Sequence, residues 1–74
     1  MKVLLDSIEK VKKFVSVIER LDGDYDLVSG RYVVDAKSIM GVLSLDLTKP
    51  LELEPRENAE NDILSGALKE FIVD

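Results

Sequence analysis

A stripe of apolar residues near the start of the chain is the feature that most limits the possible folds. Apolar side chains recur at helical spacing between residues 8 and 21, and charged or polar side chains occupy the opposite side. The members of the stripe are Ile8, Val11, Phe14, Val15, Ile18 and Leu21. The pattern predicts an amphipathic helix, and such a helix must bury its apolar face against a second layer supplied by the rest of the chain.

Signals for the start and the end of a helix flank this stripe. Asp6 and Glu9 have the spacing of a reciprocal capping box, so we expect Asp6 to cap the helix by accepting a hydrogen bond from the Glu9 amide. Gly23 follows the stripe and is predicted to end the helix in a left-handed turn. The apolar residues before Asp6 predict a short strand over residues 1–5.

The length of the chain predicts one domain over residues 1–74. A chain of this size buries only about 60% of the surface that it exposes when unfolded. Hydrophobic residues make up 46% of the sequence and charged residues 34%, a mixture typical of a compact folded domain. One core must therefore serve every element, and little volume is left for an enclosed active site.

Histidine and cysteine are both absent from the sequence. Their absence removes imidazole bases, thiol nucleophiles, the usual zinc ligands and disulfides together. We therefore expect neither an enzyme nor a protein with a metal ion or another cofactor. No segment approaches the length of a signal-peptide core or a membrane span, so the sequence predicts no membrane association and a cytoplasmic protein.

The net charge of −5 disfavours binding to nucleic acid, because contacts to phosphate need clustered basic residues. Lys10, Lys12 and Lys13 do cluster, but Glu9 and Glu19 flank them. The pattern favours a solvated helix face over a basic binding patch.

Two regions in the middle of the chain have strand character. Residues 24–36 predict a hairpin with Ser29 and Gly30 at its turn. The sequence LELE at residues 51–54 alternates apolar and acidic side chains, which predicts a strand with Leu51 and Leu53 inward and with Pro55 at its end.

Two further helices are expected, one on each side of the LELE strand. Residues 39–45 fit a short helix that is apolar on more than half of its circumference. Asn58 can cap a last helix, whose apolar stripe comprises Ile63, Leu64, Ala67, Leu68, Phe71 and Ile72. The expected element order is β-α-β-β-α-β-α.

The sequence KSIMGVLSL at residues 37–45, placed at the head of the short helix in this element order, resembles the HPr family, the histidine-containing phosphocarrier proteins of the sugar phosphotransferase system. The resemblance extends from about Asp22 to the end of the chain, and the first helix matches by pattern only. It implies an α+β fold of the open-faced β-sandwich type. In that fold a four-stranded antiparallel sheet in the order 1-4-2-3 carries three helices on one face.

The family's phosphotransfer depends on a histidine before the first helix, and this chain departs from the family there. Counted back from KSIMG without gaps, Ser7 occupies the position of the histidine and Glu9 that of a following arginine. The Ser7 hydroxyl would lie between the carboxylates of Asp6 and Glu9. These two negative charges would repel an incoming phosphoryl group. The departure implies that phosphocarrier activity is lost. A residual transfer role, or an adaptor with an unrelated partner, is the alternative function.

Ser38 has two interpretations. As a structural residue it caps the short helix by accepting the amide of Met40 or Gly41. As a functional residue it occupies the position at which many Gram-positive relatives are phosphorylated by a dedicated kinase, so the resemblance implies a regulatory phosphorylation site. Both interpretations can hold together.

The apolar residues of the short helix also have two interpretations. Too many of them are apolar for one face of so short a helix, so some are predicted to be exposed. In the family this helix surface docks partner proteins, which implies a protein-binding site at Ile39, Met40 and Leu43. The alternative is that all of them belong to the core. The sequence leaves the partner and the oligomeric state open.

Overall fold

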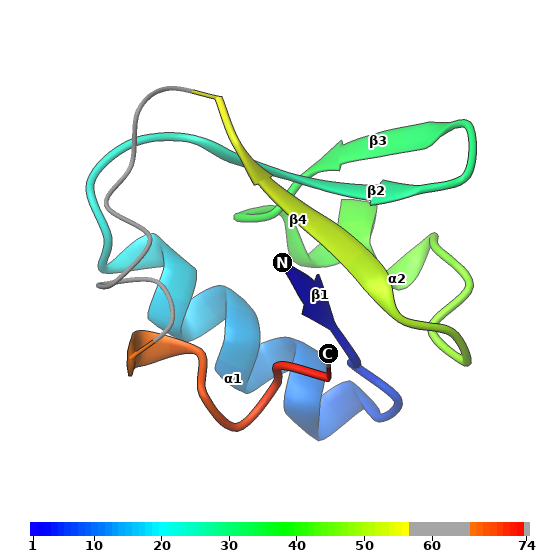
Figure 1. Ribbon diagram of the computed structural model, residues 1–74, viewed down its shortest axis with the longest axis horizontal. Helices are drawn as coiled ribbons and strands as arrows, with labels where there is room; N and C mark the ends of the chain where they lie inside the picture. The colour runs from blue at the N-terminus through cyan, green and yellow to red at the C-terminus, as the bar shows by residue number, and fades with distance from the viewer. Residues whose placement is uncertain (57–65, 74) are drawn as a thin grey trace.

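The computed structural model describes residues 1–56 and 66–73 of the chain. Along these residues the elements are β1 (Lys2–Val3), α1 (Ile8–Glu19), β2 (Tyr25–Ser29), β3 (Tyr32–Asp35), α2 (Ile39–Leu43) and β4 (Leu51–Pro55). The strands form a four-stranded sheet in the order β1-β4-β2-β3, and all its pairings are antiparallel (Figure 1). The strand order expected from the family resemblance is therefore confirmed.

The core lies between the sheet and the helices. Alternate residues of the strands point inward, among them Leu27 of β2 together with Leu51 and Leu53 of β4. Helix α1 contributes four buried side chains and α2 contributes Val42 to the same cluster, so both helices cover one face of the sheet (Figure 1). The buried residues of α1 are Val11, Phe14, Val15 and Ile18.

The amphipathic stripe of α1 is confirmed except at its ends. Ile8 was expected to be buried, but its side chain is 60% exposed. It is the first residue of the helix and lies one turn outside the buried stretch that begins at Val11. Leu21 lies just beyond the end of the helix and is only partly buried against the core.

The described part of the C-terminal segment docks on α1 and β1. The rings of Phe14 and Phe71 meet edge to face, with 5.6 Å between centroids and 87° between planes. Ile72 forms a bridge with Val3, and Leu68 is fully buried. These contacts place the segment in the core, as the apolar pattern predicted for Leu68 and Phe71.

The predicted third helix is not confirmed. Its expected start at Asn58 and its first apolar residues, Ile63 and Leu64, lie outside the described residues. Gly66 and Ala67 have helical backbone and turns follow them. The described residues thus contain α1 and α2 as defined helices.

Three local predictions were wrong in detail. The first strand covers only Lys2–Val3, not residues 1–5. The hairpin pairs Ser29 with Tyr32, so its central turn residues are Gly30 and Arg31. Gly30 has φ +58° and Arg31 does not have a positive φ, the pattern of a type II′ turn, which starts with glycine.

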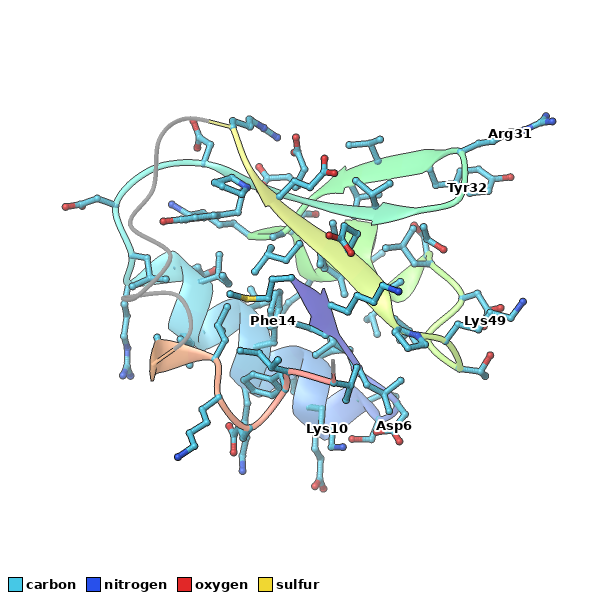
Figure 2. The ribbon with its side chains drawn as sticks, viewed as in Figure 1. Asp6, Lys10, Phe14, Arg31, Tyr32 and Lys49 are labelled. Atoms are coloured by element: carbon cyan, nitrogen blue, oxygen red, sulfur yellow. The ribbon has the colours of Figure 1, made fainter. Side chains whose placement is uncertain are left out.

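The third correction concerns the cap of α1, which is Ser7 and not Asp6. The Ser7 hydroxyl accepts a hydrogen bond from the Lys10 amide at 3.1 Å. The Asp6 carboxylate instead forms an ion pair with the Lys10 ammonium at 3.0 Å (Figure 2). Because the helix begins at Ile8, the residue directly before it, Ser7, takes the capping position.

Candidate functional site

Ser38 is the N-cap of α2, as predicted. Its backbone is extended, with φ −97° and ψ 108°, and its hydroxyl accepts a hydrogen bond from the Gly41 amide at 3.1 Å. Its carbonyl accepts the Val42 amide at 2.9 Å. The preceding turn is held by Asp35, whose carboxylate accepts the Lys37 amide at 2.9 Å and whose carbonyl accepts the Ser38 amide. Local hydrogen bonds on both sides therefore fix the position of Ser38.

The apolar residues of α2 divide between the core and the surface. Val42 is fully buried and Leu45, just after the helix, is nearly so. The side chain of Met40 is 80% exposed, and those of Ile39 and Leu43 are 40% and 39% exposed. We call Ile39, Met40 and Leu43 the α2 surface. The prediction that part of this helix is exposed is confirmed, and the alternative that all these residues are core is wrong.

Gly41 brings α2 close to β3, a role that sequence reasoning missed. A Cβ atom at this position would lie 3.3 Å from the Cβ of Val34 and 3.2 Å from the Ser38 hydroxyl oxygen. Such distances are shorter than most real contacts, so the helix approaches the strand at the limit set by glycine. Because Val34 lies on a different element, no spacing in the sequence marks this contact.

Two of the polar residues around the α2 surface, Lys37 and Ser44, have defined partners. The Lys37 ammonium donates to the Leu21 carbonyl at 3.3 Å, which ties the start of α2 to the end of α1. The Ser44 hydroxyl donates to the Gly41 carbonyl at 2.6 Å. Lys49, which is exposed, lies in the loop between α2 and β4 (Figure 2).

The turn after α2 is closed by Asp46. Its carboxylate accepts the Thr48 hydroxyl at 2.6 Å and the Thr48 amide at 3.1 Å. These hydrogen bonds stabilise the ionised carboxylate, so they lower the pKa of Asp46 below its ordinary value. The hydroxyl contributes the larger part of the shift.

Ser7, which the family resemblance predicts to occupy the position of the histidine, lies directly before α1. Its hydroxyl is engaged as the helix cap, as described above. The hydrogen bond and the charge of Lys10 stabilise the ionised carboxylate of Asp6 and so lower its pKa. The Lys10 cation thus faces Asp6, and the Ser7 hydroxyl accepts a backbone amide.

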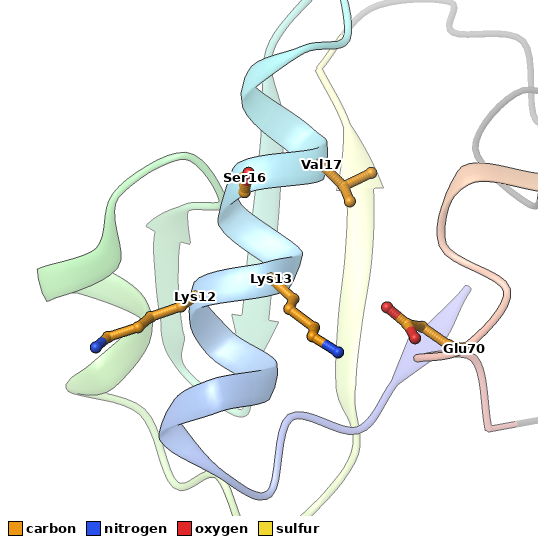
Figure 3. A pocket seen from close by; sticks show the side chains of 5 residues that line it. All are labelled: Lys12, Lys13, Ser16, Val17 and Glu70. Carbon is orange, nitrogen blue, oxygen red and sulfur yellow. The ribbon is translucent and has the colours of Figure 1, made fainter.

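A groove of about 430 Å³ follows the outer side of α1 and is separate from the α2 surface. Its lining residues are Lys12, Lys13, Ser16, Val17 and Glu70. Lys13 and Glu70 point toward one another across it (Figure 3). The groove therefore combines both signs of charge, which agrees with the interpretation of these lysines as a solvated helix face.

Two findings concern classes of function that composition disfavoured. Within residues 1–56 and 66–73, no three side chains of the metal-ligating types gather closely enough to hold a metal ion. None of the helices in the described part of the chain has the length and apolar character that crossing a membrane requires.

Comparisons with known proteins place the fold. No family model and no curated protein matches the chain. Among solved structures, the chain is similar to Crh, a catabolite repression protein of Bacillus subtilis, whose crystal structure revealed a swapping domain in an intertwined dimer. The two share 25% sequence identity with a TM-score of 0.67, and the match covers 100% of this chain and 90% of Crh. Together with the sheet order β1-β4-β2-β3, this likeness shows that the chain has the fold of the HPr family.

Proposed function

We propose that this chain is a regulatory, protein-binding relative of the phosphocarrier proteins, with the α2 surface as its contact site and Ser38 as its regulatory residue. The likeness to Crh supports a related phosphocarrier-type or regulatory protein. Crh is described as a catabolite repression protein, and we propose that this chain takes part in regulation of that kind. One observation carries the proposal to α2: Met40 is 80% exposed on a helix whose other side is anchored by the buried Val42.

The exposed residues on α2 suit a protein contact. Apolar side chains rimmed by polar groups are a common mark of such contacts, and methionine adapts its shape to different partners. Ser38 and Ser44 supply polar groups at the two ends of the helix. The helix is fixed in place by Val42 and by the close approach at Gly41, so binding would require little reorganisation of the backbone.

Ser38 is proposed as a phosphorylation site on the basis of the family resemblance. Phosphorylation would place about two negative charges within one helical turn of Met40. Such a charge changes which partners the α2 surface accepts without changing the fold. We also propose that the chain is not an enzyme. The sequence lacks histidine and cysteine, and a protein-binding module needs neither.

The phosphotransfer role is proposed to be lost. A phosphocarrier of this family holds phosphate on a histidine nitrogen, and this sequence contains no histidine. Incubation with labelled phosphoenolpyruvate and the enzyme that charges ordinary HPr should leave this chain unlabelled. Acid-labile label on the chain would contradict the proposal and would favour a residual transfer role.

Partner capture tests the contact site. Met40→Glu should abolish capture of the partner from a lysate of the source cells while it shifts the thermal midpoint by only a few degrees. Ile8→Glu is a matched control, because Ile8 is also a well exposed apolar residue but lies on α1. Equal capture by the Met40 variant would refute the site. Loss of capture with both variants would show that the effect is not specific to the α2 surface and would also count against this site.

A further inference from the structure

Strand β3 forms one edge of the sheet, and in the described residues only β2 pairs with it. The Ala36 amide donates to the Tyr25 carbonyl at 2.9 Å, so these two residues form a hydrogen-bonded pair of the β2–β3 ladder. In an antiparallel pair, bonded and non-bonded positions alternate, so the N–H and C=O of Val33 point away from β2. The side chain of Val33 is 60% exposed. An open edge of this kind is a template for another strand.

The edge is complementary to itself in charge. Arg31 precedes the strand, Asp35 ends it and Val33 lies midway between them. Figure 2 shows Arg31 and Tyr32 at the tip of the hairpin, with the Arg31 side chain extending outward. If two copies pair antiparallel about Val33, each Arg31 lies opposite Asp35 of the other copy. The pairing thus places two opposite-charge pairs symmetrically around a central apolar contact.

Acidic side chains lie side by side on the outer face of the sheet near this edge. Asp35 pairs in register with Asp26, and Asp26 pairs with Glu54, so carboxylates follow one another across three strands. Arg56 donates to the Asp26 carboxylate from Nε at 2.9 Å and from Nη2 at 2.6 Å. Like charges opposite one another on a sheet are unfavourable. Arg31 of a second copy would extend the row with a positive charge beside Asp35.

We propose that two copies of this chain associate through their β3 strands, antiparallel about Val33, and join their sheets into one. This goes beyond the proposed function, which uses α2. No segment is exchanged, so the arrangement differs from the swapped dimer described for Crh. A contact made by one short strand is smaller than a standard interface, and the net charge of −5 on each copy opposes it. The dimer is therefore weak and depends on concentration.

Charge reversal with complementation tests this pairing. Dimerisation is measured by sedimentation equilibrium at about 0.1 M salt, where charges farther apart than about 10 Å are screened. Arg31→Asp places like charges at both pairs, and so does Asp35→Arg. Each variant alone should weaken the dimer about tenfold, because two attractive pairs become repulsive. In a mixture of the two variants both pairs are again opposite in charge. The mixed dimer should therefore regain at least the affinity of the unmodified chain.

A backbone variant tests the same edge independently of charge. Val33→Pro removes the N–H that points away from β2 and leaves the β2–β3 hydrogen bonds in place, so it should abolish the dimer. Val33→Thr keeps that N–H and should still dimerise. Circular dichroism checks that each variant is folded. A chain that stays monomeric at about 1 mM would overturn the proposal. So would a dimer whose affinity neither charge reversal changes, which is the result expected for a swapped dimer.

Discussion

At the scale of single residues, two serines define where the helices begin. Ser7 and Ser38 each accept an amide three residues ahead, at 3.1 Å in both cases. Ser38→Ala should lower the free energy of unfolding by about 0.5–2 kcal/mol, because the Gly41 amide loses its acceptor. Ser38→Asp should be nearly neutral, since aspartate also caps and suits the helix dipole. Urea unfolding measures both, and an equal loss in the two variants would contradict the capping role.

The two caps also show what sequence can predict at this scale. Ser38 was predicted because it is the one residue of the capping type directly before the short apolar run. At α1 the spacing of Asp6 and Glu9 predicted Asp6 as the cap, but the cap is its neighbour Ser7, and both residue types cap well. The helix begins at Ile8, one residue later than a cap at Asp6 requires, and helix ends are uncertain by a residue or two when judged from the sequence.

At the scale of elements, the contact between α2 and β3 depends on Gly41. Gly41→Val should destabilise the fold by about 1–3 kcal/mol, because its branches would press on Val34 and the Ser38 hydroxyl. Gly66→Val is the matched control, since a Cβ at Gly66 meets no atom within 4 Å. Thermal unfolding compares the two. A Gly41 variant no less stable than the Gly66 variant would show that the helix can move away from the strand.

Elements with a strong period were predictable, and their ends were not. The alternation in LELE placed Leu51 and Leu53 inward, and both are buried in β4. The stripe of α1 likewise predicted its buried residues between Val11 and Ile18. Ile8 fits the same period yet is exposed, because periodicity assigns a face to a residue but does not say where the opposing layer ends.

At the scale of the whole molecule, one core joins the first and the last parts of the chain. Phe71→Ala should destabilise the domain by about 3–5 kcal/mol, because the buried ring packs against Phe14 and its loss leaves a cavity. That is a large part of the 5–15 kcal/mol typical of small domains. Val73→Ala, at a more exposed position nearby, serves as the control. Similar urea midpoints for the two variants would show that the C-terminal segment is not part of the cooperative unit.

Acid should weaken the fold through two surface carboxylates. The pKa values of Asp6 and Asp46 lie below the ordinary 3.8 in the folded chain. Such groups add stability above the unfolded pKa, and that stability is lost as the pH falls through 3.8 to the lowered folded values. The urea midpoint should therefore fall as the pH is lowered from about 5 to about 3. Asp6→Asn and Asp46→Asn should each make this fall shallower.

High salt distinguishes the contribution of Asp6 to this pH dependence from that of Asp46. Asp6 is held by the charge and hydrogen bond of Lys10, and this exposed ion pair is screened in high salt. Asp46 is held chiefly by the neutral Thr48 hydroxyl and amide, which salt screens little. At about 1 M salt, Asp6→Asn should no longer change the pH dependence, whereas Asp46→Asn should still reduce it. If both effects vanish together in salt, the Asp46 carboxylate is held by charge, and the turn after α2 is not closed by the hydrogen bonds assigned to it.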